Sequence, residues 1–119
     1  GIGESSPGVE LDVAGRVAIG NQTELTIASG AITITQSYHK VDTEGDTSSD
    51  DLATINGGGT VGTILVLSAA NDSRTVVVKN GTGNIVCGAD FTLDNSSDTI
   101  TLIWGGSQWM QISSSNNAA

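Results

Sequence analysis

The sequence of 119 residues is poor in several residue types that define common protein classes. It has one cysteine, so no disulfide can form within the chain and a disulfide-stapled scaffold is excluded. It has one proline, and aromatic residues make up only 3% of the chain, so the core must consist mainly of Val, Ile, Leu and Ala. No apolar run of about 18 residues occurs, which excludes a membrane-spanning helix.

Basic residues are also scarce. Four Lys and Arg residues stand against 13 Asp and Glu residues, which gives a formal net charge of −9. An acidic surface of this kind repels nucleic acid and anionic membranes and favours solubility. We therefore expect neither nucleic acid nor a membrane among the partners of this protein.

Reactive and metal-binding side chains are few. His39 is the only histidine, so one chain cannot assemble a centre with several histidine ligands. In a trimer, three copies of His39 could meet on the axis and bind a metal, but we favour a hydrogen-bonded loop histidine. Cys87 stands between apolar neighbours and a glycine with no cation beside it, which predicts a buried thiol that reacts slowly. We find no catalytic constellation, and we expect neither enzyme activity nor a cofactor.

The sequence is rich in short apolar runs separated by residues that favour turns. Its 16 glycines and many Ser, Thr, Asn and Asp residues separate segments in which apolar and polar residues alternate, the period-2 pattern of half-buried strands. The expected strands fall within residues 25–27, 32–34, 37–42, 63–68, 74–79, 84–87, 91–93 and 98–113. Residues 50–55 are expected to form one helical turn, and Asn80-Gly81 predicts a tight hairpin.

Strands spaced by roughly ten residues predict an all-β chain with no helix longer than about two turns. We expect short antiparallel strands in a β-sandwich or a jelly-roll-like domain. A β-helical stack of rungs is the alternative, and the lack of a clear internal repeat weighs against it.

The run from Asp98 to Ser113 holds both tryptophans and the only methionine, and it predicts a β-hairpin around Gly105-Gly106. A slip of one residue would move every side chain to the other face, so burial should select the register. A three-residue loop gathers most of the large apolar residues on one face, and the expected set is Ile100, Leu102, Trp104, Gln108, Met110 and Ile112. Trp109 would then lie on the opposite face.

Residues 1–22 form a segment of a different kind. Its large apolar residues recur at alternate positions, at Val9, Leu11, Val13, Val17 and Ile19. Burying one such side chain contributes roughly 1.5–3 kcal/mol, while ordering the backbone costs about 1–2 kcal/mol per residue, so the segment cannot fold alone. We therefore expect these side chains to contact other copies in a trimer. The chain is expected to divide into a shaft-like or collar segment, 1–22, and an all-β head domain, 23–119.

Two parts of the chain resemble bacteriophage fibre proteins. Gly1–Val17, with Ser6-Pro7-Gly8 followed by Leu11-Asp12-Val13, is similar to a segment that recurs in phage tail fibres and related trimeric fibre proteins. Leu25–Ser113 resembles a domain found near the ends of phage tail and head fibre proteins. The residues that carry this second resemblance are Ile32–Thr35, Ser37–His39, Ile64–Leu67, Thr75–Lys79, Phe91–Leu93, Ile100–Ile103 and Trp109.

The resemblance implies a homotrimeric structural protein of the virion, which would be a fibre, a spike or a capsid-decorating domain that serves assembly and display. Its partners would be further copies of itself and other virion proteins. One alternative is a receptor-binding tip that recognises a host surface glycan. Another is a subunit of a bacterial surface filament or adhesin.

Two groups of residues are candidates for binding. Trp104 and Trp109 could stack on the sugar rings of a glycan, although we favour packing in the core or between subunits. Asp42, Glu44 and Asp46 alternate along an acidic loop and are weak candidates for a calcium site, because calcium prefers several converging oxygens. The loop lacks the EF-hand pattern, so we expect it to be solvated and to hold no metal.

Overall fold

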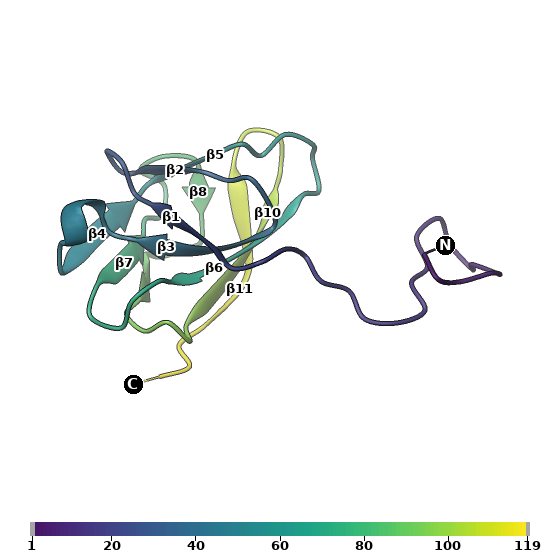
Figure 1. The fold of residues 1–119 in the computed structure, drawn as a ribbon. Helices are drawn as coiled ribbons and strands as arrows, with labels where there is room; N and C mark the ends of the chain where they lie inside the picture. Colours follow the sequence, from purple (N-terminus) through teal and green to yellow (C-terminus); the bar gives the residue numbers. More distant parts are fainter. Residues whose placement is uncertain (1, 119) are drawn as a thin grey trace.

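The computed structural model describes residues 2–118, in which eleven strands and one short 3-10 helix form (Figure 1). In chain order the elements are β1 (Thr23–Thr26), β2 (Ala31–Thr33), β3 (Tyr38–Asp42), the 3-10 helix η1 (Glu44–Asp46), β4 (Ser49–Leu52), β5 (Thr54–Asn56), β6 (Ile64–Ala69), β7 (Thr75–Val78), β8 (Ile85–Val86), β9 (Phe91–Leu93), β10 (Thr99–Trp104) and β11 (Trp109–Ser115). The prediction of an almost wholly β chain without a long helix is confirmed.

The strands form three sheets arranged in two layers. The first layer is a six-stranded sheet in the order β1-β3-β6-β10-β11-β8. The second layer combines the three-stranded sheet β4-β7-β9 with the two-stranded sheet β2-β5 (Figure 1). One core lies between the layers and takes fully buried side chains from all three sheets, such as Leu67 and Leu102, Val76, and Ile55. The predicted β-sandwich is therefore confirmed.

The chain passes to a different sheet after almost every strand. Five of the eight strand pairings are parallel and three are antiparallel, so the expectation of antiparallel strands is wrong. Parallel neighbours need a crossover connection between them. Here strands of the opposite layer serve as that connection, as β4 and β5 do between the parallel neighbours β3 and β6.

The hairpin expected at Asn80-Gly81 does not form, because the chain changes layer there. β7 belongs to the second layer and β8 to the first, so the chain after Asn80 leaves β7 instead of folding back along it. Asn80 shapes this connection in another way, because its Oδ1 accepts hydrogen bonds from the backbone N–H groups of Cys87 and Gly88 at 2.9 and 3.1 Å.

Residues 50–55 form parts of two strands, so the expected helical turn is also wrong. Leu52 pairs with Val78 in the three-stranded sheet, and Ile55 pairs with Ile32 in the two-stranded sheet. Both Leu52 and Ile55 are fully buried. Extended backbone lets these two residues enter the core at different sheets, which one turn of helix cannot do. The short helix lies instead at η1.

The hairpin of β10 and β11 forms, but in another register from the one expected. Trp104 pairs with Trp109, so the loop has four residues and begins at Gly105, whose N–H donates to Gln108 O at 2.9 Å. Trp109 therefore points into the core, whereas Met110 and Ile112 are 40% and 55% exposed. This register buries the Trp109 indole in the core and leaves Met110 and Ile112 on the outer face, and a bulge on β11 at Ile112 lets the pairing continue beyond it.

One asparagine joins the two layers at the end of this hairpin. The Asn84 side chain accepts a hydrogen bond from Ile55 N–H at 2.8 Å and donates to Ile55 O at 2.7 Å, so it pairs with β5 as a strand would. Its own carbonyl accepts from Trp109 N–H at 2.7 Å, and the Trp109 indole N–H donates to Ile55 O at 3.2 Å.

Residues 2–22, which we call the tail, extend away from the sandwich (Figure 1). Their pairing within the described chain is limited to an isolated bridge between Ile2 and Val13. The molecule is accordingly elongated, with extents of 51 × 28 × 22 Å. Gly1 and Ala119, the outer ends of the two expected domains, lie outside the described residues. The division at residues 22 and 23 stays a proposal.

Replacing Asn84 tests the connection between the layers. We expect Asn84→Ala to lower the free energy of unfolding by about 2–4 kcal/mol, because it leaves polar groups of Ile55 short of partners. Urea titration followed by tryptophan fluorescence measures this change. The matched control is Asn71→Ala, which removes one hydrogen bond to Ser73 N–H in an exposed turn and should cost less than about 1 kcal/mol. Equal losses for the two variants would contradict the role of Asn84.

Candidate interaction sites

His39 fixes the start of β1, where the tail joins the sandwich. This residue is fully buried in β3, and its Nε2 accepts hydrogen bonds from the N–H groups of Thr35 and Gln36 at 3.1 and 3.2 Å. Since Nε2 accepts, Nδ1 carries the proton and donates to Thr23 O at 3.0 Å. The expected loop histidine is thus a strand residue. With both ring nitrogens occupied inside the protomer, three copies of His39 cannot meet on an axis to hold a metal.

Gln36 holds the tail at the same point. Its side-chain amide donates to the carbonyl of Asn21, to Thr23 Oγ1 at 2.8 Å and to Tyr38 O at 2.9 Å. Gln36 and His39 together form what we call the tail anchor. Neither residue carried a sequence signal for this role, because their partners lie 13–16 residues away in the chain.

Beyond the anchor, the expected trimer contacts are uncovered. Val9, Leu11, Val17 and Ile19 are 62%, 66%, 70% and 43% exposed, and only Val13 is half-buried, beside Ile2. Large apolar side chains of this number are rarely left exposed along one segment. Their contact with other copies stays a prediction.

The three acids proposed for calcium do not converge on one point, and two of them pair with Arg74. Asp42 is 5% exposed and forms a bidentate pair with Arg74, with Nε–Oδ1 and Nη2–Oδ2 distances of 2.7 and 2.8 Å. Glu44 Oε1 accepts from Ser29 N–H at 3.2 Å, and Asp46 lies 3.8 Å from Arg74. Among residues 2–118, no group of three or more His, Cys, Asp or Glu side chains is placed to hold a metal ion.

Arg74 sets the ionisation of this cluster. Its hydrogen bonds to Asp42 hold the pKa of that carboxyl below its usual range, against the opposing effect of burial. Burial, and then the hydrogen bond and charge of Asp42, raise the pKa of the neighbouring Glu24. The acidic loop is therefore organised around an arginine that lies 32 residues away in the sequence.

Removing the arginine should destabilise the protein in a pH-dependent way. We expect Arg74→Met to cost about 3 kcal/mol at pH 7, because it leaves a buried carboxylate unpaired. Since the pKa of Asp42 is lower in the folded than in the unfolded state, the pair contributes above the unfolded pKa of about 3.9 and is lost as the pH falls through the folded value. The difference from the parent chain should therefore shrink at pH 3, as measured by urea titration at both pH values.

The control for this variant is Lys79→Met. Lys79 pairs with Asp90 at 2.6 Å, and the two side chains are 25% and 42% exposed. A pair in this position contributes less than about 1 kcal/mol. A loss for Arg74→Met that is no larger, or that grows in acid, would show that the Asp42–Arg74 pair is not a stabilising contact.

The two tryptophans form one packed pair. Their ring centroids are 5.2 Å apart and their planes meet at 51°. Trp109 is fully buried and packs in the core, as we favoured, so it cannot stack on a sugar. Trp104 is half-buried, and Gly58 packs against its ring so closely that a Cβ there would lie 2.5 Å from the indole.

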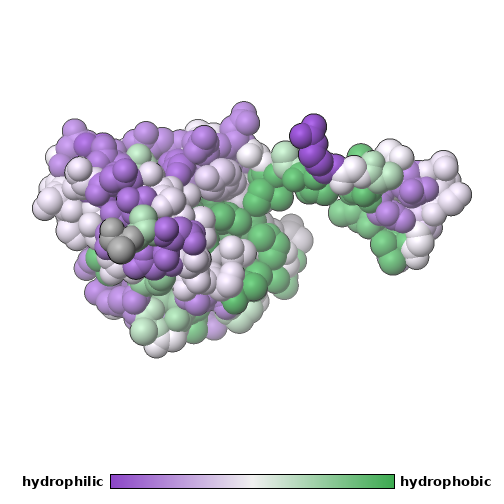
Figure 2. Space-filling model, turned by 90° about the horizontal axis from the view of Figure 1, so that it is seen from below, coloured by the Kyte–Doolittle hydropathy of each residue, from purple (hydrophilic) through white to green (hydrophobic). Residues whose placement is uncertain are grey.

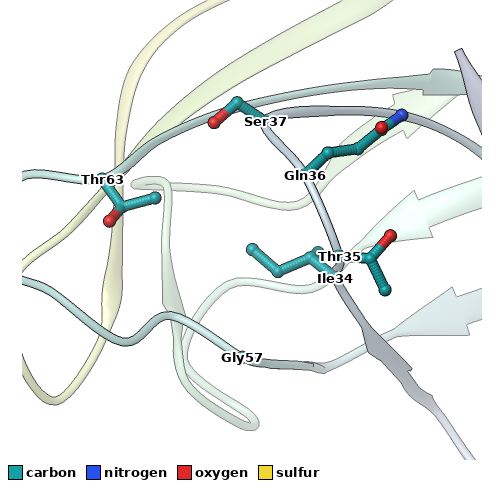
Figure 3. A pocket seen from close by; sticks show the side chains of 6 residues that line it. All are labelled: Ile34, Thr35, Gln36, Ser37, Gly57 and Thr63. Carbon is teal, nitrogen blue, oxygen red and sulfur yellow. The ribbon is translucent and has the colours of Figure 1, made fainter. Parts of the chain in front are cut away.

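The sandwich also has a small hollow, with a volume of about 180 Å³. Its lining consists of Ile34, Thr35, Gln36, Ser37, Gly57 and Thr63. Figure 3 shows the Ile34 side chain extending into the hollow towards Thr63, whereas the side chains of Thr35 and Gln36 turn away. The carbonyl of Thr63 accepts a hydrogen bond from Trp104 N–H at 2.9 Å, which connects the hollow to the tryptophan pair. No pattern in the sequence predicted this site.

Cys87 is half-buried, so it is more accessible than expected. Its Sγ lies 3.2 Å from Ala89 O, within hydrogen-bond distance. Burial and the charge of Asp90 raise the pKa of its thiol. A thiol that stays protonated is a poor nucleophile, so slow reaction with thiol reagents stays our prediction.

We compared the chain with models of protein families. The family model described as the phage depolymerase C-terminal beta sandwich domain matches residues 40–110, from β3 to the β10–β11 hairpin. The match spans more than half of the chain. The chain belongs to this family. The resemblance to phage fibre proteins is thereby confirmed, and no curated protein matches the chain.

Membership of the phage depolymerase C-terminal family makes this a phage tail-fibre-type, virion-associated domain. Phage depolymerases are enzymes, and this domain is their C-terminal, non-catalytic part. That the present chain has no activity of its own stays a prediction. In residues 2–118 the structure has no helix long and apolar enough to cross a membrane.

Proposed function

We propose that this β-sandwich is a trimeric structural domain of a phage tail fibre or spike, and that its role is assembly and display. The observation that carries the proposal is the tail, where large apolar side chains alternate along a segment that leaves the sandwich and stays uncovered. Symmetric assembly buries such side chains against neighbouring copies. The resemblance to trimeric fibre proteins supports three copies, and the family supports a phage particle over a bacterial filament or adhesin.

The oligomeric state tests this proposal. Light scattering at micromolar concentration should give three times the chain mass for the intact protein. Removing residues 1–22 should shift the mass towards that of a monomer while the circular dichroism spectrum stays that of a β protein, because the core lies within Ile27–Trp109. A stable monomer of the intact chain would refute the assembly, and a trimer unaffected by truncation would refute the role of the tail.

Glycan recognition is a second candidate, favoured by the hollow, whose lining residue Thr63 is hydrogen-bonded to the backbone of the half-buried Trp104. Ser37 and Thr63, which carry hydroxyl groups, are among its lining residues, and Thr63 Oγ1 donates to Thr60 O at 2.7 Å but can still accept. A sugar needs such hydrogen-bond partners next to an apolar surface. Six lining residues and a volume of about 180 Å³ fit part of one sugar ring, so a long glycan would contact the site at one unit only.

Titration with neutral oligosaccharides, followed by tryptophan fluorescence, tests this second function. Binding that the double variant Ser37→Ala/Thr63→Val weakens by roughly 3–10-fold per lost hydrogen bond would support it. Thr92→Ala, at an exposed position on β9, is the control and should bind as the parent chain does. The absence of binding at millimolar sugar would exclude the hollow as a glycan site.

A further inference from the structure

The outer face of the six-stranded sheet carries a continuous row of apolar side chains. The strand registers place Ile64 opposite Ile103, Ile103 opposite Met110, and Met110 opposite Val86. We call these four residues the outer row. It crosses β6, β10, β11 and β8. Met110 and Val86 are each 40% exposed, and Ile64 and Ile103 are half-buried.

The row does not belong to the core of its own sandwich. The residues next to it along the strands, such as Leu65, Leu102 and Trp109, are the ones that point inward and are fully buried. An outer sheet face that meets water normally carries polar residues, as this one does two residues further along at Thr101 and Ser113, beside the half-buried Val66. A localised apolar row on such a face is typical of an interaction surface.

The tail offers a matching surface. Neighbouring strands are about 4.8 Å apart, so a row that crosses four strands is about 14 Å long. In the free chain residues 8–11 bend and Val13 bridges Ile2. Once the segment extends on docking, Val9, Leu11 and Val13 point to one side, and at about 3.3 Å per residue they span about 13 Å. Figure 2 shows hydrophobic residues gathered on the side of the sandwich from which the tail leaves, and continuing along the tail.

We propose that the tail of one copy docks along the outer row of a neighbouring copy, with Val9, Leu11 and Val13 on Ile64, Ile103, Met110 and Val86. This inference rests on the proposed assembly and specifies its contact. Tail and sandwich both carry net negative charge, so burial of apolar surface must drive the docking and added salt should strengthen it.

The geometry of the tail anchor favours a neighbouring copy over the same copy. Gln36 and His39 fix the chain from Asn21 to Thr23, and from there the tail leads away from its own sandwich. Each copy then donates one tail and receives another. A head-to-tail contact of this kind closes into a ring when the rotation between copies allows it, and three copies form such a ring.

Disulfide trapping between two variants tests the contact directly. Both carry Cys87→Ser, because the native cysteine lies next to Val86. One adds Leu11→Cys, the other adds Met110→Cys and a purification tag, and the two are expressed together. Each chain has a single cysteine, so a disulfide between Leu11→Cys and Met110→Cys can only join two copies. We expect this crosslink after mild oxidation, identified by mass spectrometry.

The control replaces Met110→Cys by Thr92→Cys, which places the thiol at an exposed strand position on the opposite layer. This pair should not crosslink. Equal crosslinking of both pairs would show random collision and overturn the proposal. A chain that carries both Leu11→Cys and Met110→Cys and closes only within itself would also overturn it, because the tail would then cover its own sandwich.

A charged substitution in the outer row distinguishes the docking contact from trimer formation itself. Met110→Glu places a carboxylate in the row and should weaken association about tenfold or more, whereas Thr92→Glu should leave it unchanged. An intact trimer of Met110→Glu that dissociates like the parent, together with no Leu11–Met110 crosslink, would overturn the docking and leave the proposed trimer standing. A monomeric parent chain would overturn both.

Discussion

The burial of Trp109 is the contact on which the two layers depend. Its backbone bonds to Asn84, its indole N–H bonds to Ile55 in the second layer, and its ring packs on Trp104. With so few aromatic residues in the chain, this pair supplies much of the bulk that the short aliphatic strands cannot. Close approach is possible because Gly83 lies where a Cβ would be 2.1 Å from the carbonyl of Ala53. The register of the last hairpin follows from that burial.

The sequence predicted most strands, but not how they pair. Alternation of apolar and polar residues depends only on local backbone geometry, so β6, β7 and β10 could be found from it. Pairing depends on which layer a strand enters, and the same alternation fits both layers. The predicted register of the β10–β11 hairpin was wrong for a related reason. We expected Met110 and Ile112 to face the core, but both lie on the outer face of the sheet. Apolar residues on an outer face alternate with polar residues just as core-facing residues do, so the alternation does not distinguish the two faces.

The candidate sites were less predictable than the strands, because their chemistry is made by contacts distant in sequence. Asp42 appeared to belong to an acidic loop, but its partner is Arg74. Gln36 and Asn84 look like ordinary polar residues, and their roles exist only once β1 and β5 lie beside them. The tail differs, because its exposed apolar residues follow from the sequence directly: too few side chains stand there to enclose a core, whatever the rest of the chain does.

The short edges of the six-stranded sheet explain why copies should assemble by docking the tail on the outer face of the sheet and not by pairing strands at an edge. An exposed edge invites pairing with another chain, and natural sheets keep such edges short. The edge strands here, β1 and β8, have four and two residues. The tail anchor also fixes the chain at the start of β1, so this edge is continuous with the tail and its direction is set by His39. Docking that extends the sheet would gain few hydrogen bonds, whereas a tail laid across the outer face gains apolar burial along its whole contact.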